Sequence, residues 1–144
     1  GVEQYGMDPF MISLVFSANA AAGIPSARWR GRRPLAGGWM MLPAVFAVLL
    51  GFMDQPVLFW IVIVSWGFCF WTSIPGIYAL LAERSRHPAE RAGDAQAAMA
   101  AGRSAGPLLG GLLVGAGGFE TLGVVGGAVI AAAALSILVV EIRH

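Results

Sequence analysis

Long uncharged runs separated by short charged segments constrain this chain more than any other feature of its sequence. A helix needs about 20 mostly apolar residues to cross a hydrocarbon core of about 30 Å. The uncharged runs have about that length and cover residues 9–27, 34–53, 55–82, 104–119 and 121–140. They predict an all-α membrane protein with five transmembrane helices, over about 9–27, 35–53, 56–81, 97–118 and 121–140. The fourth helix includes residues 97–103 if the Arg103 side chain extends to the membrane interface.

The composition excludes several classes of protein. Only 12% of the 144 residues are charged and 58% are hydrophobic, whereas soluble domains carry about 25% charged residues. A soluble enzyme, a nucleic-acid-binding protein and a disordered tail are therefore poor interpretations. The sequence shows no nucleophile–base pair, no cluster of ligands with metal spacing and no phosphate-binding loop. We predict no enzymatic activity, no cofactor, no metal and no nucleic-acid partner, and we expect the lipid bilayer to surround the chain.

Proline and glycine positions agree with these spans. Pro9, Pro34 and Pro56 stand where helices are expected to start, and the missing N–H of proline costs little in a first turn. The pair Gly117-Gly118 is expected to form the turn between the last two helices.

The distribution of arginine predicts the orientation. The chain has nine basic residues, all arginine, and all fall on one side of the predicted membrane. Excess arginine marks cytoplasmic loops, so the N-terminus is predicted outside and the C-terminus in the cytoplasm, in a bacterial inner membrane. The cytoplasmic side carries Arg28, Arg30, Arg32, Arg33, Arg84, Arg86, Arg91, Arg103 and Arg143, and the other side carries only the acidic residues Glu3, Asp8, Asp54 and Glu120.

Polar side chains concentrate on the first and third spans. Ser65 and Thr72 share one helical face, seven residues apart, and Asn19 is the amide of the first span. We predict a substrate cavity formed by Asn19, Ser65, Thr72 and Trp71; the alternative is that these residues form interhelical hydrogen bonds and packing contacts. The nearly apolar second and fifth spans are predicted to face lipid. Arg103 is the only cation available for an anionic substrate, and its place near the cytoplasmic end argues against that role.

Glycines recur every fourth residue in the fourth span, at Gly102, Gly106 and Gly110. Small residues at this spacing let helix backbones approach closely in membranes. They predict a tightly packed hairpin of the fourth and fifth helices, with Gly123 and Gly127 repeating the spacing in the fifth; the alternative is a hinge role for these glycines.

Two motifs resemble those of the major facilitator superfamily of transporters. The loop from Gly23 to Arg33 resembles the family's cytoplasmic signature, Gly-x-x-x-Asp-Arg-x-Gly-Arg-Arg/Lys, except that its acidic residue is absent, so the gate latch formed by that carboxylate is not expected here. The resemblance assigns to this gate loop Gly23, Arg28, Gly31, Arg32 and Arg33. The second motif fits the glycine-proline signature of the family's antiporters and comprises Gly93, Gly102, Gly106, Pro107, Gly110 and Gly111.

The resemblance implies that the chain is an incomplete single transmembrane domain, residues 1–144, from the C-terminal portion of such a transporter. The third span lacks the intramembrane arginine that helix four of the family carries, so the spans are placed as helices eight to twelve. The implied function is movement of an unknown small molecule by alternating access, together with a missing N-terminal half. The alternative is a small integral-membrane structural or assembly subunit of a larger complex.

Overall fold

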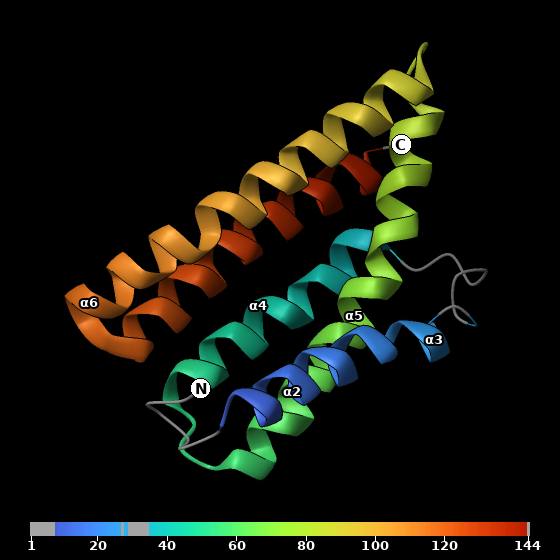
Figure 1. Ribbon diagram of the computed structural model, residues 1–144. Helices are drawn as coiled ribbons and strands as arrows, with labels where there is room; N and C mark the ends of the chain where they lie inside the picture. Colours follow the sequence, from blue (N-terminus) through green and yellow to red (C-terminus); the bar gives the residue numbers. More distant parts are fainter. Residues whose placement is uncertain (1–7, 27, 29–34, 144) are drawn as a thin grey trace.

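The computed structural model describes residues 8–26, 28 and 35–143, and in this part of the chain the secondary structure is helical without any strand. The all-α prediction is confirmed. Figure 1 shows the helices lying roughly alongside one another as an elongated bundle. The helices are α2 (Pro9–Ala21), α3 (Gly23–Ser26), α4 (Ala36–Phe52), α5 (Pro56–Glu83) and α6 (Pro88–Ile142).

Local sequence explains where the helices begin. Asp8 caps α2, because its Oδ1 accepts a hydrogen bond of 2.7 Å from the backbone N–H of Met11. Pro9 and Pro56 occupy the first turns of α2 and α5, as the sequence predicts. Pro34 lies outside the described residues.

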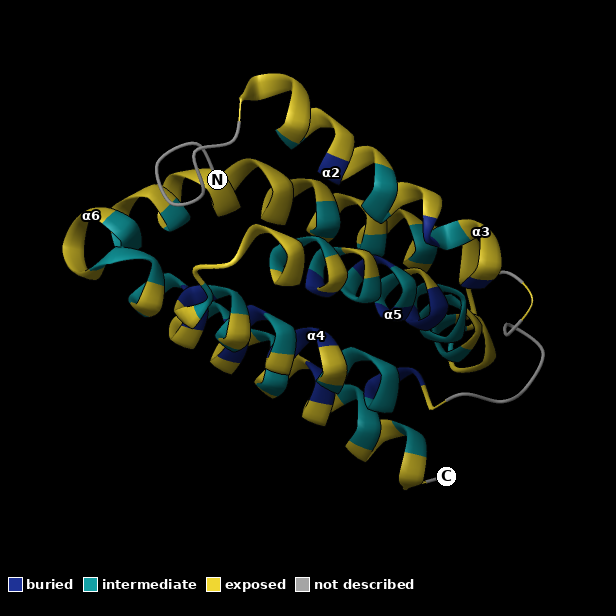
Figure 2. Ribbon diagram, turned by 90° about the horizontal axis from the view of Figure 1, so that it is seen from below, coloured by how far each residue is buried: buried dark blue, intermediate teal, exposed yellow. Residues whose placement is uncertain are grey.

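Three of the described helical segments are long and apolar enough to cross a membrane: Pro9–Ser26, α5 and α6. Helix α4 is also apolar but has 17 residues. Large apolar side chains cover the outside of the bundle, among them Phe10 at 72% and Leu108 at 68% exposure, and Figure 2 shows exposed positions along all the helices. Such a surface suits lipid and not water, so the structure is compatible with an integral membrane protein.

Helix α6 consists of two arms that fold back on each other. The backbone leaves helical geometry at Gly117 (φ −155°) and Gly118 (φ 74°), where the sequence predicts a turn. Thr121 stabilises the reversal, since its hydroxyl donates a 2.7 Å hydrogen bond to the carbonyl of Gly117. We call residues 88–116 the first arm and residues 119–142 the second arm; Figure 1 shows them side by side.

The most extensive packing joins α4 to the second arm of α6, and it corrects the expectation that both elements simply face lipid. A Cβ added at Gly123 would lie 2.8 Å from the Ala47 carbonyl oxygen and 2.9 Å from Gly51 Cα. Only one face of each helix is exposed, as at Val45 (53%) and Val129 (64%). The buried faces meet along a seam of small residues, formed by Gly37, Ala44, Ala47, Gly51, Gly123, Gly127 and Ala134.

The glycine repeat of the first arm does not make the predicted close contacts. A Cβ at Gly102, Gly106 or Gly111 would meet nothing within 4 Å outside its own helix, and at Gly110 it would only touch Leu122 Cδ1 at 3.6 Å. The prediction of a glycine-packed hairpin is wrong for this arm, because the backbones approach closely at the seam with α4 instead.

Several chain segments meet at one end of the bundle. Glu141 accepts hydrogen bonds from the backbone N–H groups of Ala36 (2.6 Å) and Gly37 (3.0 Å) at the start of α4. Arg84 Nη2 donates to the Val140 carbonyl at 2.8 Å. The end of α5, the start of α4 and the end of α6 therefore lie together. The connection between the predicted spans 56–81 and 97–118 is shorter than expected, because α5 ends at Glu83 and α6 begins at Pro88.

Candidate ligand pocket between α5 and α6

A cavity of about 620 Å³ lies between the second half of α5 and the first arm of α6. Its size falls within the range of about 300–1,000 Å³ typical of small-molecule sites. The wall combines aromatic and apolar side chains with a few polar groups, the usual pattern of such sites. The residues that line it are Phe70, Trp71, Ile74, Tyr78, Gln96, Met99, Gly102 and Arg103.

Helical spacing explains how α6 supplies its share of the wall. Gln96, Met99 and Arg103 are separated by three and four residues, so they lie on one face of the first arm. Gln96 Nε2 donates a hydrogen bond of 2.6 Å to the Tyr78 hydroxyl oxygen across the two helices. This bond ties α5 to α6 at the pocket and places an amide and a phenol side by side.

Arg103 is the one charged side chain among the described residues that line the pocket. Within the described part of the chain its guanidinium forms no hydrogen bond or ion pair; the ion pair found there joins Arg91 and Asp94 at 3.0 Å, on the exposed surface. Arginine stays protonated under all physiological conditions. The pocket is thus a positively charged site with an aromatic wall.

The aromatic wall is held from behind by the segment that follows α2. The Phe70 and Trp71 rings pack edge to face, with centroids 5.5 Å apart and an interplanar angle of 80°. A Cβ at Gly23, the first residue of α3, would lie 3.1 Å from Cγ of the Trp71 indole. The backbone of α3 therefore lies close to the indole, and a side chain at Gly23 would require the indole to shift.

Of the four side chains predicted to form a cavity, Trp71 lines this pocket and the other three do not. Asn19 Nδ2 donates to the Ile63 carbonyl of α5 at 2.8 Å. Thr72 is 1% exposed, and its hydroxyl donates to the Phe68 carbonyl of its own helix at 2.7 Å. Ser65 is half-buried in α5. The geometry of Asn19 corresponds to the interhelical hydrogen bond that the sequence leaves as the alternative.

Sequence reasoning missed Tyr78 and Gln96 and set Arg103 aside. Gln96 precedes the predicted fourth span, so it was not considered among the polar residues of the spans. In the structure α6 runs without interruption from Pro88 into this span, which brings Gln96 and Arg103 onto one wall. The three- and four-residue spacing of Gln96, Met99 and Arg103 was the available signal.

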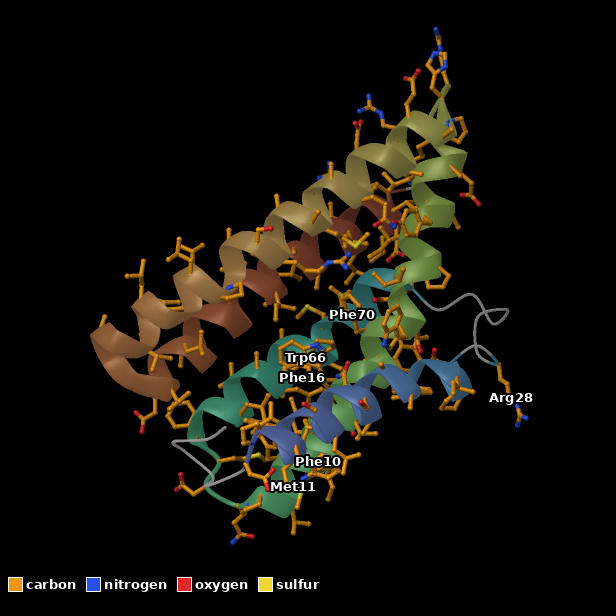
Figure 3. All side chains as sticks on the ribbon, in the orientation of Figure 1. Phe10, Met11, Phe16, Arg28, Trp66 and Phe70 are labelled. Atoms are coloured by element: carbon orange, nitrogen blue, oxygen red, sulfur yellow. The ribbon has the colours of Figure 1, made fainter. Side chains whose placement is uncertain are left out.

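The predicted gate loop is described only in part. Gly23 lies in α3, and the Arg28 side chain extends away from the helices (Figure 3). Gly31, Arg32 and Arg33 lie outside the described residues. The glycine-proline motif residues, from Gly93 to Gly111, all lie on the first arm of α6.

A second cavity, of about 320 Å³, lies among α4, α5 and the second arm of α6. Its wall is apolar and includes Phe59, Trp66 and Leu122; Figure 3 labels Trp66 in the interior of the bundle. The wall has no charged group, so it offers little chemical selectivity. Within the described residues no group of three or more His, Cys, Asp or Glu side chains could hold a metal ion.

Comparisons of the chain with protein-family models, with curated proteins and with solved structures find no match.

Proposed function

We propose that the chain is the C-terminal portion of a secondary transporter of the major facilitator type, which moves a small molecule across the membrane by alternating access. In such a mechanism two helical bundles rock around a site near the bilayer midplane. The chain described here contributes one wall of that site, and the missing N-terminal half contributes the other. The spans proposed are Pro9–Ser26, α4, α5 and the two arms of α6.

The observation that carries this proposal is the position of the pocket beside an unpacked helix face. Gly102 lines the pocket and also belongs to the glycine repeat of the first arm. Gly102 and Gly106 lie four residues apart on one face of this arm, and a Cβ added at either would have nothing within 4 Å. Glycine faces of this kind favour contact with another helix in a membrane. A second bundle docked on this face would close the pocket from its open side.

The proposed five spans include α4 despite its length. Seventeen residues at a rise of 1.5 Å make a helix of about 26 Å, and Leu35 and Met53 continue its apolar sequence at each end. Bilayers thin locally around short spans at modest cost. Five spans would put the two ends of the chain on opposite sides of the membrane, and the arginine distribution favours the start of α2 outside and the end of α6 in the cytoplasm.

Thiol accessibility in the protein expressed together with its upstream coding sequence tests this proposal. The background carries Cys69→Ser, and a single cysteine replaces Met99 in the pocket wall. A transporter predicts that a membrane-impermeant maleimide labels this cysteine from the cytoplasmic side in one state and from the outer side in another. Val129→Cys, on an exposed helix face, is the matched control and should react from neither side. Labelling of residue 99 from one side only, in every condition, would favour the structural or assembly subunit.

A further inference from the structure

We propose that the pocket between α5 and α6 binds an amphipathic organic anion, with its acidic group on Arg103 and its aromatic body against Phe70 and Trp71. The assignment of this ligand as the transported substrate rests on the proposed function. The binding itself is argued below from the contacts in the pocket. It reverses the expectation that Arg103 lies too close to the cytoplasmic end to serve a ligand.

The charge of Arg103 is the first step. Arg103 is exposed at the pocket wall, so a charged ligand can reach its guanidinium. Among the described residues no acidic side chain lines the pocket, and Asp94, the nearest acidic residue along α6, is paired with Arg91. An anion in the pocket would supply the missing partner. A carboxylate suits the guanidinium best, because the two groups form parallel charge-assisted hydrogen bonds.

The bond between Gln96 and Tyr78 adds a second donor. The Tyr78 oxygen accepts the Gln96 amide hydrogen at 2.6 Å. Its own hydroxyl hydrogen is then available for another acceptor, since a phenol both donates and accepts. The polar part of the wall thus presents a cation and a hydroxyl donor, a combination that selects an anion over a cation.

The apolar part of the pocket wall determines what the non-acidic part of the ligand must be. Phe70, Trp71, Ile74 and Met99 form an apolar and aromatic surface, and the Trp71 indole, which is 36% exposed, packs against Phe70 and lies close to Gly23. A planar ring system stacks on or against such rings with a gain beyond simple burial. An aromatic carboxylate combines both requirements, whereas an inorganic anion would leave the apolar wall unfilled.

Calorimetric titration of the whole chain in an uncharged maltoside detergent tests the proposal with 2-naphthoate as the probe. The neutral isostere 2-naphthamide shows what the charge contributes. We expect the carboxylate to bind about tenfold more tightly than the amide, the ratio typical of one charge-assisted hydrogen bond. Equal binding of the two compounds by the parent chain would already overturn the proposal.

Variants locate the site. Arg103→Gln should weaken naphthoate binding about tenfold and leave naphthamide unchanged, and Tyr78→Phe should weaken naphthoate binding by a smaller factor. Arg91→Gln is the matched control, since Arg91 is an exposed arginine of the same helix and does not line the pocket. Arg103→Lys keeps the charge but loses the parallel pair of hydrogen bonds, so it should bind naphthoate more weakly than the parent chain and more tightly than the Gln variant. It also serves as the second variant where the Gln variant does not fold. Unchanged naphthoate binding by a folded Arg103→Gln variant would overturn the proposal.

An anionic phospholipid carries the same chemistry, and a second arm of the experiment distinguishes it. The titration is repeated in nanodiscs of phosphatidylcholine alone and of phosphatidylcholine with phosphatidylglycerol. If the pocket binds a soluble substrate, naphthoate binding should depend on Arg103 in both kinds of nanodisc. If phosphatidylglycerol is the ligand, naphthoate binding should depend on Arg103 in pure phosphatidylcholine but not in nanodiscs that contain phosphatidylglycerol, and Arg103→Gln should retain less of this lipid. That result would assign the pocket to lipid and overturn the substrate assignment. Arg103-dependent binding without alternating thiol accessibility would contradict the proposed function and leave the binding site standing.

Discussion

At the scale of single residues, Glu141 illustrates how a charge near a membrane end can serve the fold. Its two carboxylate oxygens accept the first N–H groups of α4, from Ala36 and Gly37. Helix α4 has no side-chain cap of its own, so Glu141 satisfies groups that would otherwise lack a partner. The negative charge also suits the positive end of the helix dipole.

We therefore expect Glu141→Ala to lower the stability of the bundle by about 1 kcal/mol, the usual cost of losing an N-terminal cap. Thermal unfolding in detergent, followed by tryptophan fluorescence, measures the change. Glu83→Ala is the control, because Glu83 is an exposed carboxylate at the end of α5. If both variants unfold at the same temperature as the parent chain, the bonds to α4 contribute nothing to stability.

At the scale of helices, the seam between α4 and the second arm of α6 predicts where glycine is required. Gly123→Ala would place a methyl group 2.8–2.9 Å from backbone atoms of Ala47 and Gly51. Backbone atoms cannot rotate aside, so the helices must separate and lose contacts along the seam. We expect a clear fall in thermal stability and in the yield of monodisperse protein.

Gly106→Ala is the matched control for the seam, since the same methyl group there meets nothing within 4 Å. It should be tolerated by the isolated chain. The opposite ranking, with Gly106→Ala the more damaging, would restore the glycine-packed hairpin that the sequence suggests.

The turn between the arms of α6 supports a separate prediction. Gly118 has φ 74° and ψ −172°, a conformation that residues with a side chain adopt only at a cost of about 1–3 kcal/mol. Gly118→Ala should therefore lower the unfolding temperature, whereas Gly115→Ala, in the helical part of the first arm, should not. Equal unfolding temperatures for the two variants would show that the turn tolerates a side chain.

The sequence predicts the helices and the turn at Gly117-Gly118, because these depend on local hydropathy and on glycine. It does not predict which helices pair. An apolar helix such as α4 can face lipid or pack through small residues, and only the three-dimensional arrangement decides. The spacing of Ala44, Ala47 and Gly51 by three and four residues was the signal for a packed face. Predicting the pocket also requires knowing which helices pair, because Tyr78 and Gln96 meet only when α5 and α6 are placed together.

At the scale of the whole molecule, arginine is separated to one end of the bundle, although acidic residues such as Glu141 occur there too. Arg84 contacts Val140 at one end, where Figure 1 also places the C-terminus and α3. At the other end the reversal of α6 brings Glu120 against Gly51, close to Asp54 in sequence. The membrane orientation we propose depends on this separation.

A topology reporter tests the orientation of the whole chain. An enzyme that is active only in the cytoplasm, fused after His144, should be active, because arginine-rich segments are retained on the cytoplasmic side. The same reporter inserted after Asp54 should be silent, since that connection carries an acidic residue and no arginine. A reporter active only in the periplasm, placed at the same two sites, serves as the control and should give the opposite pattern. Cytoplasmic activity after Asp54 and none after His144 would invert the orientation. It would also remove Arg103 from the cytoplasmic half of the proposed transport path.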